Sequence, residues 1–204
     1  MKIHEFKAFP NPLRVRMFLA EKGINGIPFE QINVPEGEHR EPAYLAKNPY
    51  GAVPTLELDD GACISETIAI CRYFEELQPE PALMGETPRE KADIEMWQRR
   101  VEQTLNDTVA TYFHHGTPGL GSLESYQNKE WGEQNLKRYH DAMQRLDDHL
   151  EGRTFMCGET FSIADITLFS GLYLGGILEI EIPDRLTNLN RWRKVVSSRP
   201  SASA

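Results

Sequence analysis

The 204-residue sequence predicts an α/β domain followed by an all-helical domain, an α/β plus all-α chain. Two observations carry this prediction. Strand-like and helix-like patterns alternate up to about residue 77, whereas strand signals vanish beyond Pro88. We therefore expect a first domain at residues 1–79, a linker at residues 80–87 and a second, all-helical domain at residues 88–204.

The opening residues predict a strand, a helix and a second strand. Residues 2–9 mix apolar with polar side chains before a proline-rich turn, as short strands do. Asn11 suits the N-cap of the following helix and Pro12 its first position, because asparagine can accept a bond from a free N–H and proline has no N–H. Alternation over residues 28–34 then indicates a half-buried strand. Strands joined through a helix are usually parallel, so we expect one βαβ unit.

A short helix, a hairpin and a longer helix complete the first domain. The short helix is expected at residues 42–47. Residues 53–58 and 62–64 then flank Asp59-Asp60-Gly61, a turn sequence typical of antiparallel hairpins. The longer helix starts at Ser65-Glu66-Thr67 and ends before the prolines at 79 and 81.

The remaining residues carry helical signals only. Apolar residues at helical spacing predict one long helix between residues 94 and 112 and another between residues 136 and 150. Ser162 and Asp165 have the spacing of a capping box, in which each side chain satisfies a free N–H at a helix start. A last helix is expected at residues 185–196.

Charge and composition exclude several classes of partner. The chain has 31 acidic against 22 basic residues, a net charge of -9, and no segment concentrates lysine and arginine. Nucleic acid and anionic membrane surfaces are therefore poor partners. Charges interrupt every long apolar stretch and the first ten residues lack a signal-peptide core, so we expect a cytoplasmic location.

Cysteine and histidine patterns argue against a metal site. The three cysteines are an odd number without CxxC spacing, which disfavours a disulfide framework and a zinc site. His114 and His115 are adjacent, and neighbouring residues on a helix point in different directions. We therefore expect no bound metal.

Three motifs resemble the glutathione transferase superfamily, and the resemblance covers essentially the whole chain. They are N-P-Y-G-A-V-P-T-L at residues 48–56, S-E-T-I-A-I-C-R-Y at residues 65–73 and the capping box at Ser162. Residues 14–23 are similar to the first helix of bacterial members near the nu and zeta classes. The resemblance implies a thioredoxin-like glutathione-binding domain, βαβ-α-ββ-α, ahead of an all-helical domain, with glutathione as co-substrate.

The resemblance also implies a glutathione site. The backbone of Val53 is expected to pair with the cysteinyl part of glutathione like an added strand, with Pro54 in the cis form. Glu66 and Thr67 lie at a helix start, where free N–H groups favour the γ-glutamyl carboxylate, and Glu66 is expected to face the ligand's amine. The alternatives are an ordinary trans turn at Pro54 and a structural helix start at which Ser65 is the cap.

Two further groups are expected near the ligand. His39 matches the position where relatives often carry Gln or His near the glycine carboxylate, and Arg40 is the adjacent cation; either is alternatively a solvated loop residue. Asn11 matches an asparagine of the nu class whose side chain donates to the glutathione sulfur, and plain N-capping is its alternative role. Phe9 stands where relatives carry an activating Ser or Thr, so hydroxyl assistance is not expected.

The second substrate is expected near Phe9 and the helix residues Tyr112, Phe113 and His115, although core packing is an alternative for Tyr112. Trp97, Val101 and Leu105 form an apolar stripe that is most simply core, although the same long helix provides the subunit interface in relatives, so a homodimer is expected by resemblance.

The predicted function is a glutathione transferase of detoxification type. It conjugates glutathione to a small electrophile or uses it to reduce a disulfide or peroxide. The alternative is a non-catalytic glutathione-binding or interaction protein on the same fold. An oxidoreductase using its own thiol is disfavoured, because no cysteine lies at the start of the first helix.

Overall fold

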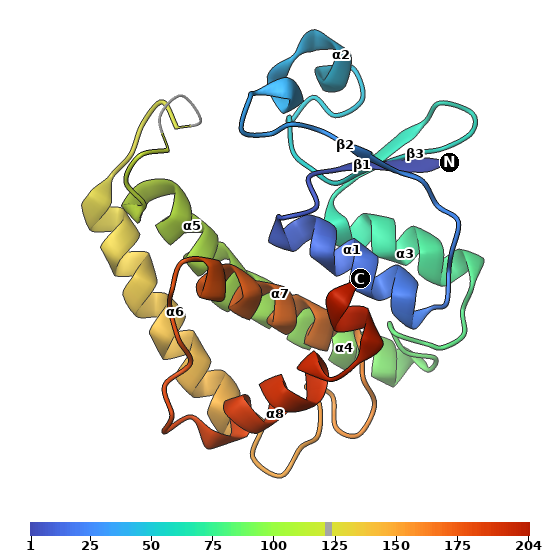
Figure 1. The fold of residues 1–204 in the computed structure, drawn as a ribbon. Coiled ribbons are helices and arrows are strands. Elements are labelled where there is room, and N and C mark those ends of the chain that lie inside the picture. Colours follow the sequence, from blue (N-terminus) through green and yellow to red (C-terminus); the bar gives the residue numbers. More distant parts are fainter. Residues whose placement is uncertain (121–123) are drawn as a thin grey trace. The chain divides into compact units, whose positions relative to one another are not determined.

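The computed structural model describes residues 1–120 and 124–204 and divides the chain into two compact units (Figure 1). The first unit comprises Met1–Ala82 with Ser203–Ala204, and the second comprises Leu83–Ala202. A mixed sheet with helices forms the first unit, whereas every named regular element within the described residues of the second unit is helical. The predicted fold class is confirmed.

The sheet of the first unit has four strands in the order β2-β1-β3-β4. The strands are β1 Lys2–Glu5, β2 Phe29–Gln31, β3 Thr55–Glu57 and β4 Cys63–Ser65. β1 and β2 are parallel, whereas β3 is antiparallel to both β1 and β4. The predicted βαβ unit and hairpin are both confirmed.

Helices cover both faces of this sheet. α1 (Pro10–Glu21) and α3 (Thr67–Leu77) pack side by side on one face, and α2 (Pro42–Leu45), which follows the 3₁₀ turn η1 (Glu38–Arg40), lies on the other (Figure 1). The core between sheet and helices contains fully buried apolar side chains from β1, α1, β3 and α3, among them Ile3, Met17, Phe18, Leu56 and Ile70.

The start of α1 differs from the prediction. The helix begins at Pro10, with Phe9 as its N-cap and no capping side chain, so Asn11 lies inside the first turn and the prediction that it caps the helix is wrong. The fixed φ of proline suits the first helical position, and Pro10 meets that requirement before Pro12 does. Similarly, the N-cap of α3 is Glu66, so the alternative of a Ser65 cap is also wrong.

The predicted long helix of the second unit is continuous but contains a π turn that the sequence did not indicate. Its parts are α4 (Pro88–Val101), the π turn η2 (Glu102–Asn106) and α5 (Asp107–Gly116). The Asn106 Nδ2 atom donates to the Thr167 carbonyl at 3.1 Å and to the Ser170 hydroxyl at 2.9 Å. A side chain at Gly171 would collide with Asn106, so this glycine permits the close approach.

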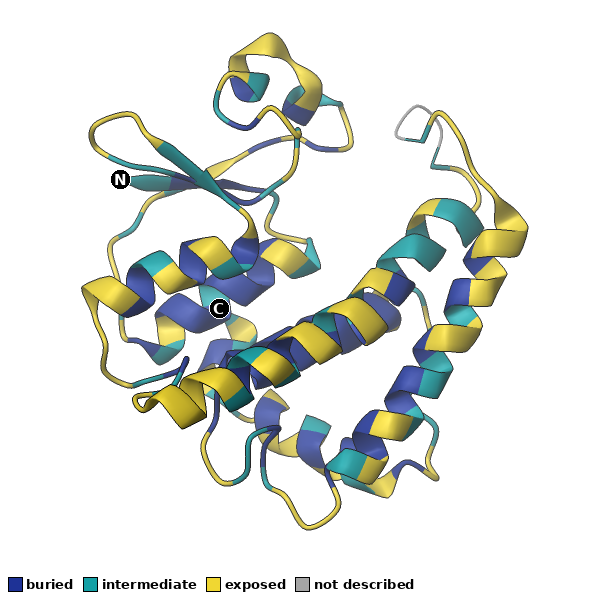
Figure 2. Cartoon of the chain, turned by 180° about the vertical axis from the view of Figure 1, so that it is seen from behind, coloured by how far each residue is buried: buried dark blue, intermediate teal, exposed yellow. Residues whose placement is uncertain are grey.

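The second unit also contains α6 (Lys129–His149), α7 (Ile163–Ile177) and α8 (Thr187–Ser197), and a 3₁₀ turn follows at Pro200–Ser203. Buried and exposed residues alternate along α6, as expected for an amphipathic helix (Figure 2). α7 is buried over most of its length. Among the described residues, no helix combines the length and the apolar character that crossing a membrane requires.

The predicted capping pair at the start of α7 is part of a larger buried network. Asp165 is fully buried, and its Oδ1 atom accepts from the Met156 N–H at 2.9 Å and from the Trp192 indole N–H at 2.8 Å. Its Oδ2 atom accepts from the Ser162 N–H at 3.1 Å and lies 3.2 Å from the Ser162 hydroxyl. Burial raises the pKa of Asp165 to about 6, although these donors oppose the rise.

We predict that Asp165→Asn lowers the free energy of unfolding by about 2 to 4 kcal/mol, because the amide N–H₂ faces donors that then lack an acceptor. Urea denaturation at neutral pH measures the change. Asp148→Asn on the exposed side of α6 is the matched control and changes stability by no more than about 0.5 kcal/mol. Equal effects of the two substitutions would show that the network adds little.

Candidate functional site

Most of the predicted ligand residues of the first unit gather at one edge of its sheet. Glu5 pairs with Gln31 in the parallel register, whereas His4 and Ser65 both pair with Thr55 in antiparallel registers. Antiparallel neighbours run in opposite directions, so the start of β3 lies beside the ends of β1, β2 and β4. The segments at this edge are residues 6–11, 32–40, 53–54 and 66–67.

The residues that lead into β3 form the first side of the site. The Val53–Pro54 peptide bond is cis, the form that the resemblance implies, so the alternative of a trans turn is wrong. Pro54 is buried, and Val53 is half-buried against an apolar cluster of Ile32, Val34 and Tyr44.

Two buried side chains that the sequence analysis missed hold this segment in place. The Tyr44 hydroxyl donates to the Ala52 carbonyl at 2.7 Å and lies 3.0 Å from the Thr55 hydroxyl. Asn48 Nδ2 donates to the same carbonyl at 2.8 Å. The available signal was the position of Asn48 at the start of the N-P-Y-G motif. Both contacts fix the residue before Val53, so they position its backbone.

His39 lies close to the same segment. Gly51 has a φ of 61°, and a Cβ atom there would be only 3.0 Å from the His39 carbonyl oxygen, so glycine allows the η1 turn to approach. His39 is 8% exposed, and its Nδ1 atom has no hydrogen-bond partner among the described residues. Burial, and then the charge of Arg40, lowers the pKa of His39, which favours its neutral form. Arg40 itself is exposed.

Glu66 has a strained backbone at the other side of the site. Its φ is 70°, a value that non-glycine residues adopt at a cost of about 1 to 3 kcal/mol. Its side chain is exposed, and no side chain caps the start of α3, whereas Thr67 is buried as the first helical residue. Such strain persists only where the surrounding structure imposes it, and it is common at ligand sites.

Asn11 and Phe9 lie in the turn between β1 and α1. Asn11 is exposed, and its Oδ1 atom accepts a long hydrogen bond of 3.5 Å from the Arg14 guanidinium. Phe9 is half-buried and packs edge to face on Phe6, with ring centroids 4.8 Å apart. Residues 8–13 contain no Ser, Thr or Tyr, so this turn itself offers no hydroxyl in place of the Ser or Thr missing at Phe9.

The other residues expected at the second-substrate pocket belong to α5 in the second unit. Tyr112, Phe113 and His115 are all half-buried, and His115 Nδ1 accepts from the Asn128 N–H at 3.2 Å. Phe9 belongs to the first unit. That these four residues line one pocket stays a prediction.

The two adjacent histidines have different surroundings. His114 is exposed and pairs with Glu124, whereas His115 contacts the start of α6. Within residues 1–120 and 124–204, no three His, Cys, Asp or Glu side chains are arranged to hold a metal ion.

Comparison with known proteins identifies the family. The model of the glutathione S-transferase N-terminal domain matches residues 10–77, and that of the C-terminal domain matches residues 103–200. Over 203 residues the chain is 44% identical to glutathione S-transferase 2 of Saccharomyces cerevisiae, a match that spans 98% of this chain and 87% of that protein. The chain belongs to the glutathione S-transferase family.

A solved structure and a second relative of this chain show how widely the fold is used. The crystal structure of Gtt2 from Saccharomyces cerevisiae superposes with a TM-score of 0.96 at 44% identity, covering 100% of this chain and 99% of that one. Elongation factor 1-gamma of Rattus norvegicus is 29% identical over 203 residues, which are 96% of this chain but only 44% of that protein. Proteins with different names therefore share this architecture.

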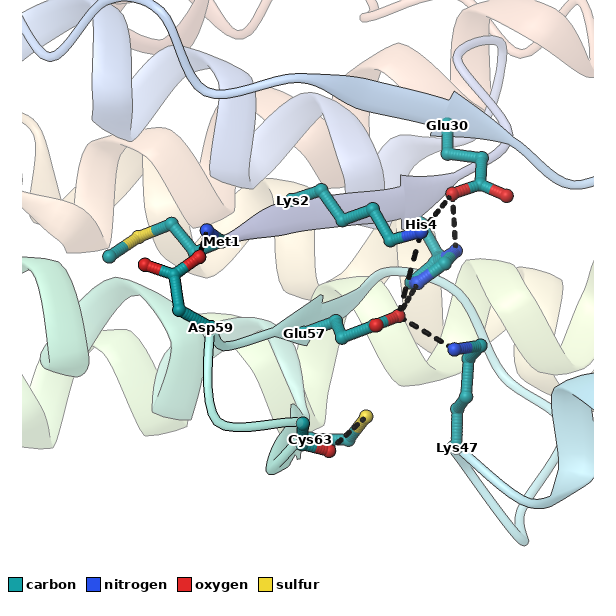
Figure 3. Close-up of polar contacts among 9 residues, drawn as sticks. Met1, Lys2, His4, Glu30, Lys47, Glu57, Asp59 and Cys63 are labelled. Carbon is teal, nitrogen blue, oxygen red and sulfur yellow. Dashed lines mark hydrogen bonds and ion pairs between the residues drawn. The ribbon is translucent and has the colours of Figure 1, made fainter.

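A network of charges crosses the sheet of the first unit (Figure 3). His4 is buried on β1, and its Nε2 atom lies 2.6 Å from Glu57 Oε2. The Lys47 ammonium donates to the same oxygen at 2.7 Å, and Lys2 pairs with Glu30 at 2.8 Å. A pocket of about 110 Å³ beside this network is lined by Tyr44 but by none of the residues predicted to bind glutathione.

The network makes stability depend on pH in the acid range. Hydrogen bonds from Lys47 and then His4 lower the pKa of Glu57 from 4.5 to about 2. A carboxyl whose pKa is lower in the folded state contributes its full stabilisation above the unfolded pKa and loses it as the pH falls through the folded value.

We predict that Glu57→Gln flattens the decline of unfolding free energy between pH 4.5 and pH 2, because the substituted side chain does not titrate. Urea denaturation at several pH values measures the slope. Glu36→Gln, at an exposed position, is the control and keeps the wild-type slope. Identical slopes for wild type and Glu57→Gln would contradict the assigned cause.

Proposed function

We propose that this protein is an enzyme that binds glutathione at the sheet edge described above and transfers it to a small electrophile, or uses it to reduce a disulfide or peroxide. The observation that carries the proposal is the strained Glu66 at the uncapped start of α3, beside the cis Val53–Pro54 bond. Strain of this kind is maintained where a ligand must be met in one fixed geometry.

The chemistry of glutathione matches the groups at this edge. The γ-glutamyl carboxylate suits the free N–H groups of Thr67 and its neighbours, and the Glu66 carboxylate suits the adjacent ammonium group. The backbone of Val53 can pair with the cysteinyl unit of glutathione as one β-strand pairs with another. His39 and Arg40 supply donors for the glycine carboxylate. Neutral His39 donates through one ring nitrogen, whereas Arg40 adds a permanent charge.

The start of α1 favours Asn11 as the group that stabilises the thiolate. The Phe9 N–H bonds to Phe6 and the Leu13 N–H bonds to Phe9, so the helix leaves only positions 10–12 without an intrahelical partner. Pro10 and Pro12 have no N–H. Asn11 therefore supplies the free main-chain donor of this turn and, through its carboxamide, a side-chain donor as well.

The second substrate completes the proposal. The acceptor-binding residues that we propose are Tyr112, Phe113 and His115 of the second unit and Phe9 of the first, whose mainly aromatic side chains suit a small apolar electrophile or disulfide. We also propose a cytoplasmic homodimer with a role in detoxification. Val101 on α4 is fully buried within the second unit, so its role is core packing.

A second candidate is a non-catalytic glutathione-binding or interaction protein. Phe9 in place of a hydroxyl residue favours it, and so does the match to elongation factor 1-gamma, a relative whose name is not that of a transferase. Turnover with a chloronitrobenzene acceptor and with a glutathione mixed disulfide separates the two candidates. Binding without turnover of either substrate would support the second.

Calorimetry with glutathione tests the site directly. We predict that Glu66→Ala weakens binding by about 1 to 3 kcal/mol, because it removes the partner of the ligand's ammonium group. Glu66→Gln keeps the side-chain shape, removes the charge and weakens binding less. Glu76→Ala, at an exposed position of α3, is the control and binds as wild type does. Wild-type affinity in Glu66→Ala would place the site elsewhere.

We predict that Asn11→Ala lowers kcat by about 10- to 100-fold and changes glutathione affinity less, because its side chain contacts the sulfur mainly as charge develops there. Steady-state kinetics with the better of the two acceptors measures both constants. Asn25→Ala, an exposed asparagine of the same unit, is the control and keeps wild-type kinetics. An unchanged kcat in Asn11→Ala would remove Asn11 from the mechanism.

A further inference from the structure

Arg14 is a buried cation one helical turn beyond Asn11. Arg14 is 3% exposed and belongs to α1, the helix that packs against α3. The guanidinium charge reaches Cys71 on α3: burial raises the pKa of that thiol to about 12, and the charge of Arg14 opposes the rise. An arginine buried at this depth is held in one place by its surroundings, so it is a fixed reference point for Asn11.

The contact between the two residues determines which end of the Asn11 carboxamide faces outward. Arg14 Nη1 donates to Asn11 Oδ1 at 3.5 Å. A guanidinium group has donors and no acceptor, so only the oxygen of the carboxamide can face it. The Nδ2 group of Asn11 must then point away from Arg14, and because Asn11 is exposed this N–H₂ is available to a ligand.

From this contact we infer that Arg14 is a positioning residue that keeps the Asn11 N–H₂ group, rather than its carbonyl oxygen, directed at the glutathione sulfur. The inference rests on the proposed role of Asn11 and extends it. Without Arg14 the Asn11 carboxamide is free to rotate, so that its oxygen and its N–H₂ group can exchange places. For part of the time it presents an oxygen whose partial negative charge repels a thiolate. The reactive anion is then less stable, although both substrates still bind.

The pKa of the glutathione thiol in the complex tests the inference. It is measured by titrating the ultraviolet absorbance of the thiolate with saturating glutathione. We expect Asn11→Ala to raise this pKa by about one unit and Arg14→Met to raise it by a smaller amount. The double variant should have the pKa of Asn11→Ala alone, because Arg14 acts through Asn11. Arg14→Lys retains a cation that can only donate hydrogen bonds, so it should raise the thiol pKa less than Arg14→Met does.

A purely structural role for Arg14 predicts a different pattern. Lys22→Gln is the matched control, because Lys22 is another buried cation of the same unit, whose ammonium donates to the carbonyls of Gln78, Pro79 and Pro81. It should lower the melting temperature and leave the thiol pKa unchanged. If Arg14→Met does not fold, Arg14→Lys and its double variant with Asn11→Ala complete the same cycle.

Two results would overturn the positioning role of Arg14 and leave the proposed role of Asn11 intact. In the first, the thiol pKa is unchanged in every folded Arg14 variant. In the second, the shift caused by Arg14→Met adds in full to that of Asn11→Ala, which means that the charge acts without the carboxamide. A third result, an unchanged thiol pKa in Asn11→Ala itself, refutes the proposed role of Asn11, and the positioning role of Arg14 with it.

Discussion

The antiparallel pairing of β3 with both β1 and β4 determines where every candidate ligand contact of the first unit lies. A shift of one residue would turn the side chains of β3 to the opposite face and move the Val53–Pro54 bond away from Glu66. The polar contacts of Tyr44 and Asn48 with Ala52 then fix the chain that enters this strand. Backbone geometry at the candidate site thus depends on sheet register more than on the side chains predicted to contact a ligand.

Much of the fold was predictable because its signals are local. The turn at Asp59-Asp60-Gly61, the alternation in the second strand and the helical spacing in the second unit each act within a few residues. Two features were not predicted correctly, the start of α1 and the π turn, because they depend on competing residues or on residues far away in the sequence. Two prolines compete for the first position of α1, and the π turn depends on the packing of Asn106 against Gly171, which is 65 positions further along the chain.

The motifs predicted which residues belong to the candidate site, but they did not predict the backbone conformation of Glu66 or the burial of Arg14. Val53 and Glu66 were identified through family resemblance, but the positive φ of Glu66 has no sequence signal, because glycine is the residue that normally marks this conformation. From the sequence alone, Arg14 would be placed among the exposed charged residues of a helix. Its burial and its contact with Asn11 distinguish it in the structure from Arg16, two positions later, which pairs with Glu5.

The two helix starts of the first unit differ in how many main-chain donors they offer. At α1, proline on both sides of Asn11 leaves a single amide, whereas at α3 the residues Thr67, Ile68 and Ala69 each carry one. A lone sulfur anion is satisfied by one or two donors, but a carboxylate has two oxygens to solvate. Under the proposed function, proline placement directs the thiolate of glutathione to the start of α1 and its γ-glutamyl carboxylate to the start of α3, and it disfavours inorganic oxyanions as competitors at the start of α1.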